Sequence, residues 1–246
     1  MNTMRNMRRL LMFTALLIVS GAAALSAQNQ LDYRPLDPAI DPDIDLFIGD
    51  WRQSIPFNSH GTLTERAILS PLAGGDPLNP TRKSEVLRYV RGFSFATLDP
   101  GSMTVPTAPD TIQEIFYITD GEGVIRTAGA TADLRDGIFV LVPQGCEFTI
   151  ENTGDVRMTM YLIKEPVMQG FTPKKDIVVK DEKRTPFRDQ GPVKGHWSHN
   201  GRNMFTPADG LSLLESVALI TIEPMTVAHP HSHGGPIEEA WTTVDG

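Results

Sequence analysis

The densest group of side chains able to do chemistry lies near the end of the sequence, where three of the six histidines fall within five residues. The segment reads His229-Pro-His231-Ser-His233, and the adjacent carboxylates Glu238 and Glu239 follow it. On a β-strand residues i and i+2 share a face, so His231 and His233 are expected to point the same way. Imidazole nitrogens with a carboxylate suit Fe, Mn, Ni, Cu or Zn, and ligand type alone does not choose among these metals. The pattern predicts a site for one divalent transition metal, and an exposed His-rich turn is the alternative.

Short β-rich runs separated by Gly- and Pro-containing turns must position this segment. No helical period of 3.6 residues runs through the chain after Ser84, and many short strands spaced by turn signals are typical of an antiparallel barrel or sandwich. The fold class predicted from the sequence is therefore all-β. The runs are Val86–Val90, Phe93–Leu98, Ile115–Ile118, Ile138–Val142, Phe148–Ile150, Met158–Ile163 and, later, Leu211–Ile222.

The β-rich part contains an internal repeat. Ile112–Gly121 aligns with Ile237–Gly246 and pairs Glu114 with Glu239. Each copy is preceded by a similar five-residue motif, at Ala96–Pro100 and at Ile220–Pro224. In order, its positions hold Ala or Ile, then Thr, then Leu or Ile, then an acidic residue, then Pro. Two copies of one β-domain are expected. Since half a barrel would expose unpaired strand edges, we expect the C-terminal copy to be incomplete in this chain.

The first copy resembles the cupin superfamily in two motifs. Glu114 and Gly121 match the Glu-x6-Gly part of the first motif, although no His-x-His precedes them. The second motif matches except that Phe148 stands where the family usually places a metal-binding His. The resemblance implies a small double-stranded β-helix (jelly-roll) barrel over residues 84–165 that lacks metal ligands. The second-motif residues are Gly137, Pro143, Gly145, Phe148 and Asn152.

The second copy resembles the cupin first motif, His-x-His-x(3–4)-Glu-x6-Gly. The resemblance implies that His231, His233 and Glu239 are the metal ligands. Glu239 fits the spacing to Gly246, but five residues separate it from His233. Glu238 fits the histidine spacing and not the glycine spacing, so it is the reserve ligand. The family's fourth ligand is expected beyond Gly246.

Two cupin double-stranded β-helix barrels in one chain would make a bicupin. This resemblance implies a metal-dependent enzyme of the dioxygenase, decarboxylase, isomerase or aminohydrolase type. Its substrate would be a small acid, a sugar derivative or an oxygenated compound, and the sequence assigns no catalytic residue. The alternative is a non-catalytic bicupin that binds a small molecule or serves a storage-like role. The resemblance also allows a homo-oligomer.

The N-terminus and the overall charge predict where the protein works. Residues 1–27 combine a basic head, an apolar run and small residues, which is typical of a secretory signal peptide. The apolar run is short for a membrane span, which needs about 20 residues, so no stable span is expected after cleavage. An uncleaved anchor is the alternative. We expect a periplasmic or extracellular protein, and a formal net charge of -8 argues against nucleic acid as a partner.

The remaining segments are less informative. Residues 28–83 are expected to be a loop-rich extension, residues 166–200 a linker, and residues 201–246 the first part of the C-terminal barrel. His196 and His199, in the linker, either pack in a loop or reach the mouth of the second barrel. His60 has no partner pattern. The single cysteine, Cys146, is interpreted as a small packing residue, because no His lies near it in the sequence.

Overall fold

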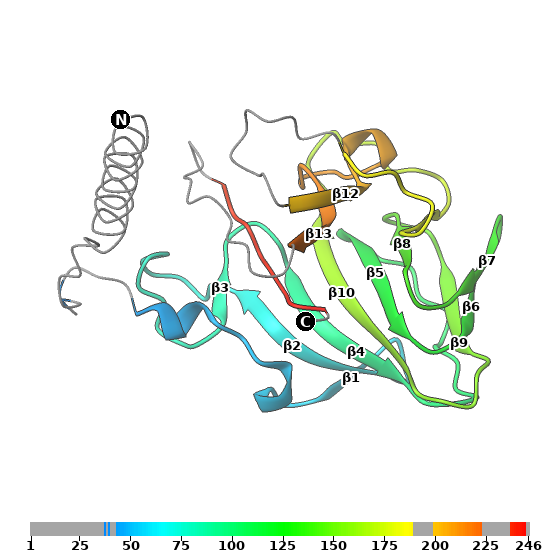
Figure 1. Ribbon diagram of the computed structural model, residues 1–246, viewed down its shortest axis with the longest axis horizontal. Coiled ribbons are helices and arrows are strands. Elements are labelled where there is room, and N and C mark those ends of the chain that lie inside the picture. The colour runs from blue at the N-terminus through cyan, green and yellow to red at the C-terminus, as the bar shows by residue number, and fades with distance from the viewer. Residues whose placement is uncertain (1–36, 38, 40–42, 189–198, 223–236, 245–246) are drawn as a thin grey trace, which may run out of the picture. The chain divides into compact units, whose positions relative to one another are not determined.

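A computed structural model describes residues 37, 39, 43–188, 199–222 and 237–244 of the chain (Figure 1). Met1–Pro42 and Asp43–Gly246 form separate units, and almost all of the first unit, including the predicted signal peptide, lies outside the described residues. In the second unit the described residues form β-strands and three short 3-10 helices. Within the described part of the chain no helix has the length and hydropathy needed to cross a bilayer.

Strands in the second unit follow one another with short connections. The 3-10 helices are η1 (Ile44–Phe47), η2 (Trp51–Gln53) and η3 (Pro207–Asp209). The strands are β1 (Phe57–Ser59), β2 (Leu63–Pro71), β3 (Glu85–Leu87), β4 (Gly92–Leu98), β5 (Ile112–Asp120), β6 (Gly123–Thr127), β7 (Thr131–Leu134), β8 (Ile138–Val142), β9 (Phe148–Asn152), β10 (Met158–Pro166), β11 (Val178–Asp181), β12 (His199–Phe205) and β13 (Val217–Ile222).

These strands form one large sheet and two small ones. The large sheet has eight strands in the order β1-β2-β4-β10-β5-β8-β11, with β3 paired to β2, and the three-stranded sheet has the order β7-β6-β9. Apolar side chains from both sheets meet in one buried cluster, among them Phe116 and Val140 of the large sheet and Ile125 and Ile150 of the small one. The sequence prediction of an all-β fold is confirmed.

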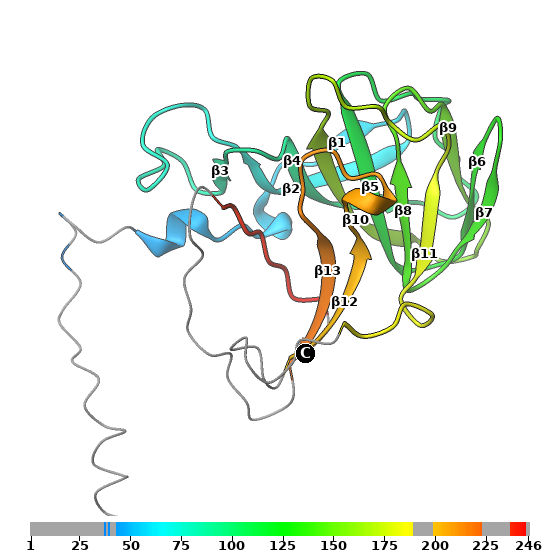
Figure 2. The ribbon, with the colours of Figure 1, turned by 90° about the horizontal axis from the view of Figure 1, so that it is seen from above.

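The apolar residues of strand β5 follow one another almost without interruption, because both faces of the strand are covered. Phe116 and Ile118 point into the cluster between the sheets, while Ile115 and Tyr117 pack in a second cluster on the outer face. Successive side chains of a strand point to opposite faces, so a strand covered on both faces is apolar at every position. The outer face of β5 is covered by residues of the β12–β13 hairpin, including Met204, Phe205 and Val217 (Figure 2).

Two motif glycines occupy backbone positions that other residues rarely adopt. Gly121 has φ +89°, and a Cβ there would lie 2.8 Å from the Cα of Met158. Gly137 has φ +83°, in the turn before β8. Glycine populates positive φ without a steric penalty, so these two positions allow the tight turns that end β5 and begin β8.

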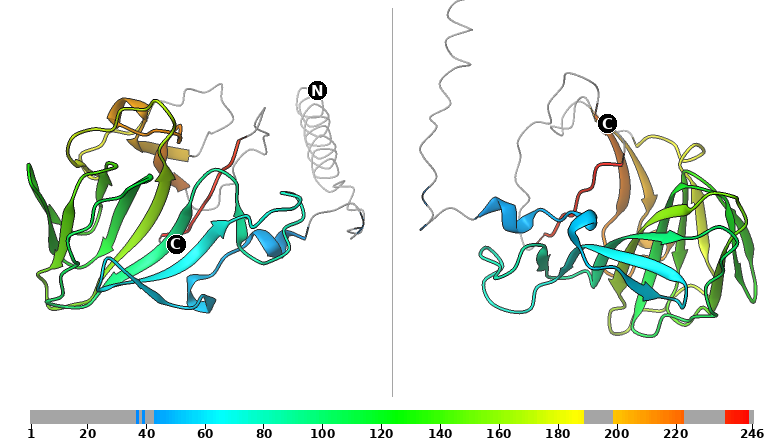
Figure 3. Two further views of the ribbon diagram at one scale, coloured as in Figure 1. Left: turned by 180° about the vertical axis from the view of Figure 1, so that it is seen from behind. Right: turned by 90° about the horizontal axis from the view of Figure 1, so that it is seen from below.

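Two segments outside the first predicted barrel supply strands to its sheet. β1 and β2 lie in the segment expected to be loop-rich, and they form one edge of the large sheet (Figure 3). β11 lies in the expected linker and pairs with β8 at the other edge. The turn between β1 and β2 joins the sheet to residues 103–105, because Val105 N donates to the carbonyl of His60 and Thr62 Oγ1 donates to the carbonyl of Met103.

The β12–β13 hairpin repeats the pairing of β2 with β4. Thr64 pairs with Thr97 and Ala67 with Ser94, after which the register skips one residue of β2. In the second hairpin Asn200 pairs with Thr221 and Asn203 with Ala218, and the register then skips one residue of β12. A β-bulge leaves one extra residue on one strand, so the same bulge at the matching step is a specific likeness between the hairpins.

A buried carboxylate fastens the loop between β12 and β13 to the large sheet. Glu165 of β10 is fully buried, and its Oε1 accepts hydrogen bonds of 2.6 Å from the amides of Leu213 and Leu214. Its Oε2 accepts a hydrogen bond of 2.5 Å from Nε2 of Gln113, which also donates to the carbonyl of Gly210. The amides of Leu213 and Leu214 and the side chain of Gln113 therefore share one carboxylate as acceptor.

Glu165→Ala should lower the free energy of unfolding by about 3 kcal/mol, because it leaves two partly buried backbone amides and the buried Gln113 side chain without this acceptor. Urea denaturation followed by circular dichroism measures the change. Glu151→Ala is the control: its ion pair with Arg126 is solvent-exposed, so its loss should cost less than about 1 kcal/mol. Equal unfolding midpoints for the two variants would contradict the role given to Glu165.

Candidate functional site

The motif carboxylate of the first copy lies in the interior of the barrel and is paired with a histidine. Glu114 of β5 is 3% exposed, and its Oε2 lies 3.0 Å from Nε2 of His60. Both side chains are at most 5% exposed. A carboxylate taken from water into apolar surroundings needs a hydrogen-bond donor, and the imidazole supplies it here.

His60 reaches Glu114 from the turn between β1 and β2. Its Nδ1 lies 2.9 Å from Oγ of Ser59, so both ring nitrogens have a partner. The imidazole packs against the rings of Phe116 and Phe148, with centroid distances of 6.3 and 5.6 Å. Its φ of +49° is uncommon for a residue other than glycine, and such conformations concentrate at functional sites.

The sequence did not identify His60, because 54 residues separate it from Glu114. The one signal available was its place in the run Asn58-Ser59-His60-Gly61, a turn sequence directly before a strand. His60 and Glu114 are two candidate metal ligands, while transition-metal sites typically use three or four protein ligands. No group of three His, Cys, Asp or Glu side chains suited to a metal occurs among the residues that the structure describes.

The metal ligands predicted in the second copy are only partly described. His231 and His233 lie outside the described residues, so the structure does not test whether they approach Glu239. Glu239 is exposed, and its Oε2 accepts a hydrogen bond of 3.2 Å from Nε1 of Trp241. The reserve ligand Glu238 accepts hydrogen bonds from the amides of Arg88, at 2.5 Å, and Val90, at 3.3 Å.

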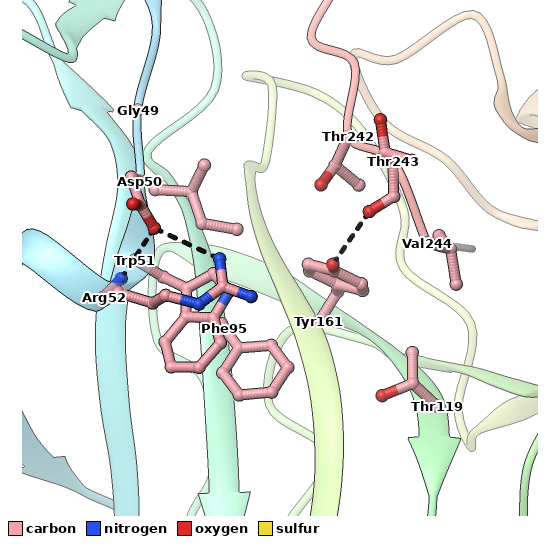
Figure 4. A pocket seen from close by; sticks show the side chains of 11 residues that line it. Gly49, Asp50, Trp51, Arg52, Phe95, Thr119, Tyr161, Thr242, Thr243 and Val244 are labelled. Atoms are coloured by element: carbon pink, nitrogen blue, oxygen red, sulfur yellow. Dashed lines mark hydrogen bonds and ion pairs between the residues drawn. The ribbon is translucent and has the colours of Figure 1, made fainter. Parts of the chain in front are cut away.

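A cleft of about 380 Å³ separates residues 242–244 from the outer face of the large sheet (Figure 4). Trp51 stacks on Phe95 at a centroid distance of 4.3 Å, and Phe95 meets Tyr161 edge-on at 5.6 Å. The hydroxyl of Tyr161 donates to the carbonyl of Thr243 at 3.3 Å across the cleft. The lining residues are Gly49, Asp50, Trp51, Arg52, Ile68, Phe95, Thr119, Tyr161, Thr242, Thr243 and Val244.

Cys146 packs in the barrel interior, as the sequence predicts. Burial raises the pKa of its thiol, and the nearby carboxylate of Asp176 raises it further. The thiolate is the reactive form of cysteine, so these surroundings reduce its reactivity. Among the described residues, the hydrogen-bond partner of the Cys146 thiol is the carboxylate of Asp176 and not a histidine.

Residues 94–164 match the family model described as Cupin domain. This range falls within residues 84–165, so the resemblance found in the first copy is confirmed. Residues 94–164 are therefore a cupin domain. No curated protein matches the chain.

Several solved structures resemble the chain at low sequence identity. A predicted oxalate decarboxylase from Thermotoga maritima is 21% identical, with a TM-score of 0.40 over 49% of this chain and 99% of that chain. A bacterial pirin from Escherichia coli, solved with nickel(II), is 14% identical, with a TM-score of 0.45 over 64% of this chain and 70% of that chain. A protein from Pseudomonas aeruginosa described as glyoxylate induced is 12% identical, with a TM-score of 0.49 over 72% of this chain and 63% of that chain. These similarities carry no argument about activity.

His60→Ala should lower the free energy of unfolding by about 3 kcal/mol, because it strips a buried carboxylate of its partner and leaves a cavity. Urea denaturation measures the difference. Thr62→Ala is a matched control in the same turn, where an exposed hydroxyl bonds a carbonyl, and it should cost less than about 1 kcal/mol. A His60→Ala protein as stable as the wild type would show that Glu114 does not need the imidazole.

Alkylation of Cys146 should require a higher pH than alkylation of an unstructured cysteine. The thiolate forms only above the pKa of the thiol, and burial raises that pKa in the folded protein. Rates of alkylation by iodoacetamide are measured between about pH 7 and pH 11. They should begin to rise at a higher pH for the folded protein than for the urea-unfolded protein. Coincident pH profiles would contradict the raised pKa.

Proposed function

We propose that the protein is an exported bicupin that binds one divalent transition metal in its second copy and acts on a small molecule there. His231, His233 and Glu239 are the proposed ligands. Two imidazoles and a carboxylate form a donor set that suits Fe, Mn, Ni, Cu or Zn. When bound, such a metal supplies a Lewis acid toward a carboxylate or carbonyl oxygen of the substrate.

The observation that carries the proposal is the repeated hairpin. β2 and β4 precede β5, the strand of Glu114, and they share register and bulge with β12 and β13. In the sequence, the histidine cluster and Glu239 come after β13, in the place that corresponds to residues 107–114 after β4. The second copy therefore begins as the first does, which supports a second barrel around the predicted ligands.

The interior of the first copy supports the proposal that the metal binds in the second copy and not in the first. Glu114 is bonded to His60, and the buried ring of Phe148 occupies the motif position of the usual histidine. Phe148 has no atom that binds a metal, so the described part of the first copy lacks the three or four ligands of a typical transition-metal site. Metal binding is therefore assigned to the second copy.

The backbone contacts of Glu238 argue against this reserve carboxylate as the ligand. Both oxygens of Glu238 accept backbone hydrogen bonds, from Arg88 and Val90. Moving this side chain to a metal would leave two amides without an acceptor, at a cost of about 1–3 kcal/mol each if they remained buried. Glu239 accepts a hydrogen bond from the exposed indole of Trp241, and the repeat pairs it with the motif carboxylate Glu114.

The purified protein should contain about one equivalent of metal, and the His231→Ala/His233→Ala variant should contain almost none, because two of three ligands are lost. Plasma mass spectrometry of whole protein kept free of chelators measures the metal and identifies the element. Glu239→Gln should weaken metal binding about 10- to 100-fold, since it removes the only anionic ligand.

Glu238→Gln is the matched control, one residue away and with the same change of charge. It should retain the metal. Metal that remains in the double histidine variant, or that is lost from Glu238→Gln and retained in Glu239→Gln, would contradict this ligand set. Absence of metal from the wild type would favour a binding protein without metal.

A further inference from the structure

Three side chains at the end of the first barrel form a continuous line of hydrogen bonds. Oγ of Ser59 lies 2.9 Å from Nδ1 of His60, and Nε2 of the same ring lies 3.0 Å from Oε2 of Glu114. A hydroxyl in contact with an imidazole that a carboxylate orients is the general arrangement of an activated nucleophile. Nothing in the proposed metal chemistry uses these residues.

The carboxylate determines which way the protons point along this line. An ionised Glu114 only accepts hydrogen bonds, so the proton of a neutral imidazole is held at Nε2. Nδ1 is then the acceptor, and the hydroxyl of Ser59 donates to it. This is the tautomer that a general base needs in order to take a proton from serine.

The two ends of the line lie in different surroundings. Glu114 is buried with Phe116 and Phe148 around its imidazole partner, whereas Ser59 is only partly buried at the end of β1. A developing positive charge on His60 would therefore face a desolvated carboxylate, where electrostatic interactions are stronger than in water. The hydroxyl at the other end is nearest to solvent.

Exposed apolar side chains occur on the two segments that meet at this turn. Phe57 lies two residues before Ser59 on the same face of β1 and is 46% exposed. Met103 and Val105 are each 51% exposed, and backbone and hydroxyl hydrogen bonds fasten residues 103–105 to the turn that carries His60. An exposed apolar rim beside a polar reacting group suits a small ester with a short acyl chain.

We propose that Ser59, His60 and Glu114 form an acyl-transfer site that hydrolyses small carboxylic esters. Oγ of Ser59 attacks the ester carbonyl carbon while Nδ1 of His60 takes the hydroxyl proton. The bond from carbonyl carbon to alkoxy oxygen breaks, and His60 returns the proton to the departing alcohol. Water then attacks the acyl-serine, passes a proton through Nδ1 to Oγ, and releases the carboxylic acid. Glu114 holds the ring in position and stabilises its charged form.

A fluorophosphonate probe tests the nucleophile directly, because serine oxygen displaces fluoride and keeps the phosphonyl group. Intact mass and peptide mapping of the whole protein should show one adduct, on Ser59. Ser59→Ala should remove the adduct. Ser54→Ala is the matched control: Ser54 is also partly buried, but its hydroxyl donates to the carbonyl of Trp51 and not to an imidazole.

The base is tested by His60→Asn, which tolerates positive φ and keeps an amide donor for Glu114. It should lower the maximal labelling rate about 100-fold. Glu114→Gln should lower the maximal rate about tenfold and leave the probe concentration at half-maximal rate unchanged, as expected for a positioning residue. Thermal melts of each variant confirm that it is folded.

Absence of an adduct on Ser59 would overturn the proposal, as would equal labelling of Ser59 and Ser54. Labelling of Ser59 at the wild-type rate in folded His60→Asn would also overturn it, because the contact with the imidazole would then be only structural. These outcomes do not depend on metal, so the two proposals fail separately.

Discussion

The interaction on which the first barrel depends is the contact between Glu114 and His60. A carboxylate in an interior lined mainly by apolar side chains needs a hydrogen-bond partner, and here that partner comes from outside the strands of the motif. That partner lies in a turn, so the turn must close over the end of the barrel, and β1 and β2 are drawn into the sheet on either side of it. The segment before the first motif is thereby part of the same sheet as the strands of the cupin domain.

The outer face of the large sheet is covered by the β12–β13 hairpin, whose pairing repeats that of β2 with β4. β5 and β8 are apolar on the side away from the barrel interior, where Tyr117 stacks on Phe139 at a centroid distance of 4.1 Å and Phe139 meets Phe205 edge-on. The β12–β13 hairpin covers this surface. Burial raises the pKa of Tyr117 well above its usual range, and the Glu182 carboxylate adds to this, so Tyr117 remains a hydrogen-bond donor to Glu182.

The sequence predicts those parts of the fold that local pattern determines. Apolar runs and turn glycines such as Gly121 identify the strands and turns, because strand period and positive φ act over a few residues. The contacts of His60 with Glu114 and of Glu165 with Leu213 join residues 54 and 48 positions apart, and no pattern in a single sequence encodes them. The spacing of residues in the sequence therefore did not identify His60. The histidine cluster of residues 229–233, which the spacing did identify, lies outside the described residues.

The position of Glu165 bears on the order in which the chain folds. Its strand, β10, completes the sheet next to β4 and β5, but two of its donors lie 48 and 49 residues further along the chain. While the protein is being synthesised from its N-terminus, the strands up to β10 must hold this carboxylate without those partners. Its final packing therefore waits for residues 210–214, and the large sheet and the β12–β13 hairpin are expected to reach their native state as one cooperative unit.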